Sequence, residues 1–234
     1  MLVLAEGSLR LMGFHFNMYP ERVEFGSPTP DDIKYGWVSD PSRLWVAPDY
    51  FNRLKQVQPG GVVFMGCSCT QYGDYDRQLA SLAEQHYPGQ AFSYVNLGML
   101  GWTTFQGLQQ FKLDVVELKP RVVTVYYGWN DHWIGFGMED KQAWAMSHSF
   151  LNKLRWLRLA QLVQKVQAKL TGFERAQFPQ RVSLKDFEDN LTQMAQLARE
   201  HDICLVLITA PSGHVKGQEP QFLKDRWIKD LSQT

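Results

Sequence analysis

The chain has 234 residues, of which 44% are hydrophobic and 21% are charged, as in an ordinary globular protein. Twenty-four basic residues balance twenty-four acidic ones, so the net charge gives no electrostatic case for a nucleic-acid partner or another polyanion. Three cysteines without a second Cys/His cluster indicate neither a disulfide framework nor a metal site.

The N-terminal part of the chain lacks the regular pattern of the rest. The apolar start, residues 1–5, runs directly into Glu6 and is too short for a whole signal peptide. We expect either an amphipathic first helix ending near Gly13 or the tail of a trimmed membrane anchor, which would make the parent protein extracytoplasmic or membrane-anchored. No apolar run reaches the ~18 residues of a transmembrane helix. Residues 14–60 are rich in Pro, Asp, Tyr and Trp. They predict an irregular extension over residues 1–59 that wraps the domain, with short strands such as 44–46.

From residue 60 onward, the sequence predicts alternating strands and helices. Short β-branched and apolar runs predict four buried strands, at residues 61–65, 92–96, 121–127 and 203–208. Apolar residues at helical spacing and chain-breaking residues predict helices at residues 76–85, 104–118, 141–149, 150–170, 184–201 and 220–231. Thr103 and Gln106 have the spacing of a capping box, and Ser183 is the expected N-cap of a later helix. The alternation predicts an α/β domain over residues 60–234, with a parallel sheet between helices.

Glycines and polar groups follow each of the first three predicted strands. They are Gly66-Cys67-Ser68, Asn96 through Gly101, and Gly128-Trp129-Asn130-Asp131. Ligands of parallel sheets lie beyond the carboxyl ends of the strands. A Ser at a strand end is often only an N-cap, and Gly-x-Asn-Asp alone is often a turn. The three together favour a hydroxyl nucleophile, Ser68, with oxyanion donors at Gly101 and Asn130.

These blocks resemble those of the SGNH/GDSL hydrolase superfamily. Residues 66–70 match its first block, 96–104 its second and 128–131 its third, and residues 181–211 look like its penultimate helix and strand. The resemblance covers about residues 60–212. It implies a flavodoxin-like three-layer α/β/α sandwich.

The same resemblance implies an ester hydrolase or acyltransferase that needs no cofactor. Ser68 would attack the ester carbonyl, while the N–H groups of Ser68 and Gly101 and the side chain of Asn130 would hold the oxyanion. Substrates would be carboxylic esters or O-acetyl groups, including those of acylated carbohydrates. Neither a nucleic acid nor a metal enters this chemistry.

Two departures from the family pattern bear on activity. Cys67 stands where the family usually has Asp, and the chain contains no Asp-x-x-His, the motif that carries the family's base. His214, after the fourth predicted strand, is the histidine nearest to that role, and His132, beside Asn130 and Asp131, could line the pocket. We expect a C-terminally truncated copy whose base lies in missing sequence. The alternative is a catalytically impaired SGNH-like binding domain.

The remaining candidate pocket residues surround the three blocks. Aromatic residues of the loop after the third strand would wall an acyl chain or a sugar ring, or would form a lid packed on the helices. This set, together with Asp131 and His132, comprises Trp129, Trp133, Phe136 and Trp144. Cys67 and Cys69 flank Ser68, and we interpret them as small apolar fillers; the alternative is a reactive thiol at a helix N-terminus.

Overall fold

The computed structural model of the chain describes residues 1–16, 38–90, 92–133, 138–148, 154, 156–171 and 179–209. Three of the sequence predictions lie outside these residues: the final helix at 220–231, His214 and Phe136.

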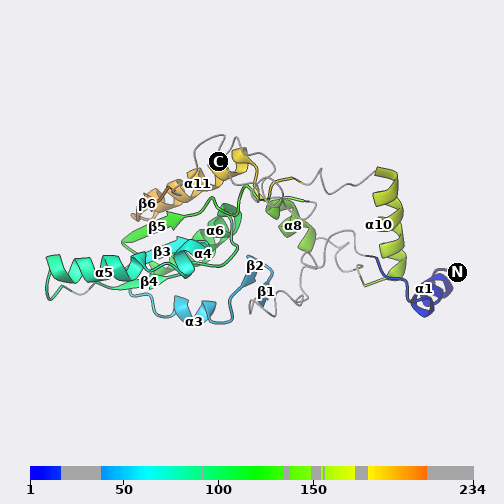
Figure 1. The fold of residues 1–234 in the computed structure, drawn as a ribbon, viewed down its shortest axis with the longest axis horizontal. Coiled ribbons are helices and arrows are strands. Elements are labelled where there is room, and N and C mark those ends of the chain that lie inside the picture. The colour runs from blue at the N-terminus through cyan, green and yellow to red at the C-terminus, as the bar shows by residue number, and fades with distance from the viewer. Residues whose placement is uncertain are drawn as a thin grey trace, which may run out of the picture.

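A four-stranded parallel sheet forms the centre of the domain (Figure 1). Its order is β4-β3-β5-β6, and the strands are β3 (Val62–Gly66), β4 (Tyr94–Asn96), β5 (Val122–Tyr126) and β6 (Cys204–Leu207). Val63 of the central strand β3 pairs with Val95 on one side and Val123 on the other. The predicted α/β fold with a parallel sheet is therefore confirmed. β4, β5 and β6 lie within their predicted segments, and β3 extends one residue beyond the predicted 61–65.

Alternating side chains of the strands pack into two different layers. Val63, Val95 and Val123 belong to the main apolar core, which also contains residues of α6 (Thr104–Gln110) and α11 (Leu184–Glu200). The opposite face carries aromatic rings. Phe64 of β3 meets Tyr75 of α5 (Tyr75–His86) edge-on, with ring centroids 5.4 Å apart. Helices thus cover both faces of the sheet.

Two predicted helix starts are confirmed at atomic detail. Thr103 and Gln106 form the reciprocal capping box at the start of α6. The hydroxyl of Ser183 accepts the N–H of Asp186 at 3.2 Å and caps α11. The helix after Thr103 is not uniform, however. Between α6 and α7 (Val116–Leu118) the chain forms a π-helical turn, η2 (Phe111–Val115), which adds a residue to the turn and changes the face that the helix presents.

The part of the N-terminal extension that the structure describes packs on the domain through buried polar contacts. It contains an antiparallel pair, β1 (Val38–Asp40) and β2 (Leu44–Val46), and a short helix, α3 (Tyr50–Leu54). Arg43, beside β2, binds Asp114 of the π-helical turn through Nε at 2.9 Å and Nη2 at 2.6 Å. The phenol of Tyr50 donates to the same carboxylate at 2.5 Å.

Two more helices lie at the end of the molecule away from the sheet: α1 (Leu2–Leu11) and α10 (Arg158–Thr171) (Figure 1). The carboxylate of Glu6 in α1 accepts the N–H groups of Arg158 and Leu159 at 3.0 and 2.9 Å, so α1 caps α10. No residue of α1 is buried, which differs from an ordinary amphipathic helix.

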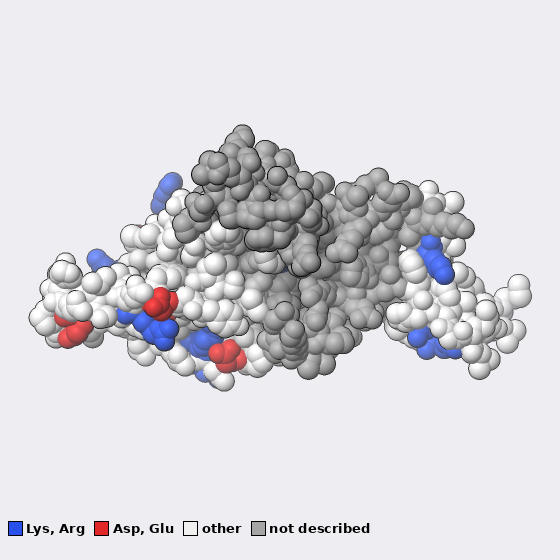
Figure 2. All heavy atoms as spheres, in the orientation of Figure 1, with Lys and Arg blue, Asp and Glu red and all other residues white. Residues whose placement is uncertain are grey.

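The helix α8 (Asp140–Ser147) follows the loop after β5. Within the described segments, no helix is long and apolar enough to cross a membrane. Acidic and basic side chains occur side by side on the described part of the α/β domain in the face that Figure 2 shows, in keeping with the zero net charge.

One burial prediction was wrong. The segment 203–208 was expected to form a buried strand, yet Cys204, Val206 and Leu207 of β6 are exposed. The reason is position, because β6 is the last strand of the described sheet and pairs only with β5. An apolar run indicates a strand but does not indicate whether it lies at the centre or at the edge.

Candidate active site

The loops that follow β3, β4 and β5 are hydrogen-bonded to one another at one edge of the sheet. The N–H of Cys67, just after β3, donates to the carbonyl of Tyr126 at the end of β5, at 3.3 Å. The N–H of Met99, after β4, donates to the carbonyl of Gly66 at 2.9 Å. The order β4-β3-β5 makes these loops neighbours, although Met99 and Gly66 are 33 positions apart in the sequence and Cys67 and Tyr126 are 59 apart.

Ser68 is the first residue of the short helix α4 (Ser68–Gln71) and is half-buried. Its N–H has no acceptor among the described residues, as expected in the first turn of a helix. Gly66 makes the sharp turn before it possible, since a Cβ there would lie 2.0 Å from Thr70 Oγ1 and 2.6 Å from the carbonyl oxygen of Tyr126. The sequence therefore brings a serine out of a buried strand directly into a helix start.

The loop after β4 packs backbone against backbone on this helix. A Cβ on Gly98 would lie 2.5 Å from the backbone nitrogen of Gln71 and 2.8 Å from Thr70 Cβ. The side chain of Asn96 donates to the carbonyl of Thr70 at 2.7 Å, and the N–H of Leu100 donates to Gln71 Oε1. Any shift of this loop is therefore transmitted to the helix that begins with the serine.

Gly101 occupies the left-handed region, with φ of +75°, which side chains rarely adopt. Its N–H has no acceptor within the described segments, while its carbonyl accepts Arg181 Nη1 at 2.6 Å. Asn130 is almost fully buried, at 3% exposure, and its Nδ2 donates to the carbonyl of Trp102 at 2.8 Å. A primary amide carries two N–H groups, so one remains for a further acceptor.

Asp131 serves to join the third loop to α6. Its Oδ1 accepts the N–H of Thr104 at 2.8 Å and also the Thr104 hydroxyl, and its Oδ2 accepts the N–H of Gly128 at 3.2 Å. Burial raises the pKa of this carboxyl to about 6, and the bonds from Thr104 oppose the rise. The carboxylate is thus committed to the backbone of the site.

His132 is half-buried beside these groups. Its Nδ1 lies 3.0 Å from the carbonyl oxygen of Gly128; a carbonyl only accepts, so Nδ1 carries the proton and Nε2 keeps its lone pair. Burial lowers the pKa of this imidazole, and the bond to Gly128 opposes the shift. The ring is therefore held as a neutral imidazole. The other described histidines, at 15, 86, 148 and 201, are exposed.

Three tryptophans of the predicted pocket form hydrogen bonds with different parts of the fold. The indole N–H of Trp129 lies 3.4 Å from the Tyr126 hydroxyl, at the end of the sheet. Trp144, on α8, instead donates to the carbonyl of Ser42 in the N-terminal extension, at 3.1 Å. Trp133 is 36% exposed, and its carbonyl accepts the N–H of Arg181.

Cys67 is completely buried beneath Ser68, and burial raises the pKa of its thiol to about 12. It is thus a protonated core residue in the place where the family pattern has an aspartate. Cys69 is half-buried, Cys204 is exposed, and all three thiols are free. Across the described segments, no three His, Cys, Asp or Glu side chains form a group that could hold a metal ion.

Sequence reasoning did not identify the groups that hold the second loop in place. Arg53, from α3, donates to the carbonyls of Asn96 and Gly98 at 3.0 and 3.1 Å. Arg181 reaches Gly101 from just before α11, and Trp45 reaches Leu100 from β2. None of them lies in a recognisable motif. Arg181 stands between a loop and a predicted helix, and an arginine buried at such a place needs hydrogen-bond partners. Those partners are distant in the sequence, so the sequence alone does not identify them.

Comparisons with known proteins identify the family of the chain. No curated protein matches the chain. Among solved structures, it is similar to Axe2, an acetylxylan esterase from Geobacillus stearothermophilus, with 20% identity, a TM-score of 0.31, and coverage of 64% of this chain and 77% of that one. It is also similar to TesA, with 18% identity, a TM-score of 0.36, and coverage of 70% and 67%. The model of the GDSL-like lipase/acylhydrolase family matches residues 61–234, and the chain belongs to that family.

Proposed function

We propose that the protein is a serine ester hydrolase, or an acyltransferase of the same mechanism, with Ser68 as its nucleophile. The observation that supports it most is the joining of three loops, which carry Ser68, the unpaired N–H of Gly101 and the amide of Asn130. Family membership supports acyl-bond chemistry, since the family is one of lipases and acylhydrolases.

In this mechanism Ser68 Oγ forms a bond to the ester carbonyl carbon while a base takes the hydroxyl proton. The carbonyl oxygen becomes an oxyanion, which the N–H groups of Ser68 and Gly101 and the side chain of Asn130 stabilise. Collapse expels the alcohol, which takes up the proton, and water or another acceptor then attacks the acyl-enzyme. Loss of one oxyanion donor typically raises such a barrier by about 3 kcal/mol.

Two histidines, His132 and His214, are candidates for the general base that takes the proton of Ser68. His132 is supported by its neutral ring and its free Nε2, with Nδ1–H directed to a carbonyl, as in bases oriented by a neighbouring acceptor. His214 lies outside the described residues. We assign the role to His132, so that H132A should lower turnover of a simple acetyl ester by ~100-fold while H214A has a smaller effect.

A fluorophosphonate probe tests the nucleophile. The probe phosphonylates an activated serine with loss of fluoride, so the wild type should be labelled and S68A should not. Ser81, an exposed hydroxyl on α5, provides the matched control, and S81A should label like the wild type. Hydrolysis of p-nitrophenyl acetate is measured in parallel. Equal labelling of the wild type and S68A would exclude Ser68 as the nucleophile.

A second reading is favoured by one specific observation, the absence of Asp-x-x-His from the chain. In that reading the protein is an SGNH-like binding domain that keeps the pocket without turnover. It predicts neither labelling nor ester hydrolysis in the wild type, together with retained binding of an acylated carbohydrate, measured by calorimetry.

A further inference from the structure

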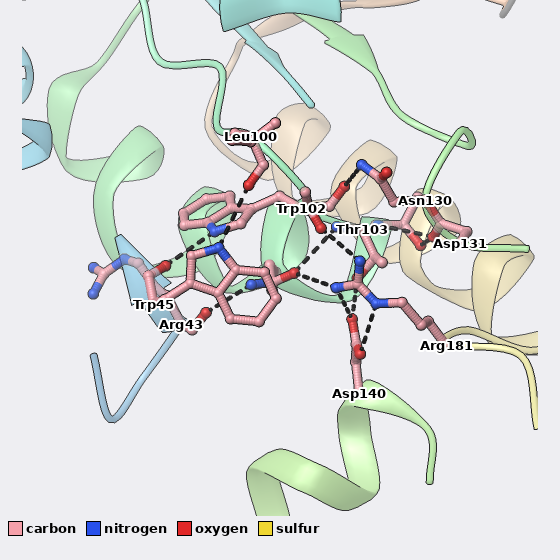
Figure 3. Close-up of polar contacts among 12 residues, drawn as sticks. Arg43, Trp45, Leu100, Trp102, Thr103, Asn130, Asp131, Asp140 and Arg181 are labelled. Atoms are coloured by element: carbon pink, nitrogen blue, oxygen red, sulfur yellow. Dashed lines mark hydrogen bonds and ion pairs between the residues drawn. The ribbon is translucent and has the colours of Figure 1, made fainter. Parts of the chain in front are cut away.

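We propose that Trp45 and Arg181 are positioning residues that aim the N–H of Gly101 at the oxyanion. Both lie outside the three family blocks, and Trp45 comes from the N-terminal extension. The inference rests on the proposed role of Gly101 as an oxyanion donor. Figure 3 shows both side chains directed at the loop after β4, and it shows Asp140 bound to Arg181.

The first contact fixes the peptide plane that contains the Gly101 N–H. Trp45 Nε1 donates to the carbonyl oxygen of Leu100 at 3.4 Å. In a trans peptide the C=O of one residue and the N–H of the next point in opposite directions. Holding the Leu100 carbonyl on the side of Trp45 therefore directs the N–H of Gly101 the other way.

The second contact fixes the peptide plane on the other side of the Gly101 Cα. Arg181 Nη1 donates to the Gly101 carbonyl at 2.6 Å. The guanidinium is itself held by Asp140, with Nε at 3.1 Å from Oδ1 and Nη2 at 2.8 Å from Oδ2. Its planar face lies over the Trp45 ring, 5.5 Å from the centroid, so the two braces support each other.

A glycine needs such braces more than any other residue. Gly101 adopts φ of +75°, and glycine visits both signs of φ at similar cost, so its own backbone does not fix the N–H direction. The two held carbonyls specify the conformation instead. A donor misplaced by about 1 Å can lose ~100-fold in rate. The buried pair of Arg181 and Asp140 is therefore expected to act on the rate as well as on folding.

The test compares two double variants. R181M/D140N removes the brace without leaving an unpaired buried charge. R43M/D114N removes a second buried arginine–carboxylate pair of the described residues. Arg43 and Asp114 are 7% and 8% exposed, against 8% for Arg181 and for Asp140, and their side chains do not contact Gly101. In protein labelled with 15N-glycine, relaxation gives the order parameter of the Gly101 amide, and the fluorophosphonate labelling rate is measured well below the melting temperature of each variant.

We expect the Gly101 order parameter to fall from ~0.85 to below ~0.6 in R181M/D140N and to stay unchanged in R43M/D114N. The labelling rate should fall ~10- to 100-fold in R181M/D140N only, with kcat for p-nitrophenyl acetate lowered and KM retained. A rigid Gly101 amide in folded R181M/D140N overturns the inference. If the wild type and S68A label equally while the amide loosens as expected, the positioning stands and the proposed function fails.

W45F tests the indole N–H alone, because it keeps the aromatic ring under Arg181. Loss of one neutral hydrogen bond predicts a labelling rate about fivefold lower and a partial fall of the Gly101 order parameter. W156F is its matched control. Trp156 precedes α10, and Arg10 of α1 lies over its ring, 5.5 Å from the centroid, so this variant also keeps an aromatic ring under an arginine. If W45F and W156F lower the labelling rate equally, the assigned role of the Trp45 N–H is wrong.

Discussion

Two buried arginine–carboxylate pairs stand near α6, and they differ in what the arginine does with its remaining donors. Arg43 binds Asp114 and donates another N–H to Asp40. Its hydrogen-bond partners therefore lie in the N-terminal extension and in the π-helical turn η2. Arg181 binds Asp140 in the same forked way but donates a further N–H to the carbonyl of Gly101. The first ion pair thus attaches the N-terminal extension to the domain, and the second holds the loop that carries Gly101.

Gln106 links the two pairs. Its Nε2 donates to the carbonyl of Arg43 at 3.0 Å, and its Oε1 accepts Arg181 Nη2 at 3.2 Å and the N–H of Thr103 at 3.2 Å. A capping-box glutamine therefore also connects the N-terminal extension with the loop that carries Gly101. We infer that the extension is part of the structural support of the active site.

The largest expected effect comes from removing one arginine and leaving its acid. R43M and R181M should each lower the free energy of unfolding by about 3–5 kcal/mol, because a buried carboxylate loses its counter-charge. Urea denaturation measures the loss. The double variants R43M/D114N and R181M/D140N should recover much of it. Single and double variants of equal stability would contradict the assignment of both pairs as desolvated ion pairs.

Asp131 sharpens the comparison, since it is as buried as the other two acids, at 3% exposure, but makes no hydrogen bond with an arginine among the described residues. The charge of Arg181 lowers the pKa of Asp131 without cancelling the rise from burial. Its folded pKa of about 6 lies above the ordinary 3.8, so folding takes up a proton between these values. Below about pH 4 the burial of this group therefore does not lower the free energy of unfolding, and above about pH 6 it lowers it by the full amount. A shift of about two units corresponds to about 3 kcal/mol.

The variant D131N isolates this titration, because Asn stays neutral at every pH used. As pH rises from about 4 to 7, the unfolding free energy of the wild type should fall relative to that of D131N by up to about 3 kcal/mol. Urea denaturation at several pH values gives the difference. A difference that stays constant with pH would mean that Asp131 titrates normally in the folded state.

The elements that sequence reasoning found share one property: their signal is local. The run from Val62 to Gly66 and the spacing of Thr103 and Gln106 are read within a few residues, and each led to the observed strand or cap. The sheet order and the rim where its loops meet follow from general rules for parallel sheets. The exposure of β6, the last strand of the sheet within the described residues, was missed because nothing local in its apolar run indicates how many neighbours a strand has.

The braces of the site could not be found in the same way, because their partners are far apart in sequence. Trp45 and Leu100 are separated by 55 residues, and Arg181 and Gly101 by 80. No spacing rule relates such residues, and an isolated Trp or Arg has many ordinary roles. No sequence pattern predicted the π-helical turn that contains Asp114, the partner of Arg43, and a continuous helix was expected there.

Tyr50 tests the attachment side of the comparison. Its hydroxyl donates to Asp114 and accepts Gln110 Nε2 at 3.1 Å, in a site where the ring is completely buried. Y50F should lower the unfolding free energy by about 1–3 kcal/mol, because two buried polar groups lose a partner. The labelling rate of Ser68 at a temperature below the transition should not change. A lower labelling rate would show that the two pairs are coupled through Gln106 more tightly than their contacts indicate.

The smallest expected effect provides the reference for the others. Ser183 caps α11 through its bond with the N–H of Asp186, and S183A should lower the unfolding free energy by about 1 kcal/mol, the usual value of an N-cap. The cap shares no hydrogen-bond partner with Arg43 or Asp114. The cost of S183A should therefore add to that of R43M/D114N within about 0.5 kcal/mol in urea denaturation. A larger deviation would mean that α11 and the N-terminal extension unfold as separate units, and the stability comparison between the two arginine pairs would then have to be made for each unit separately.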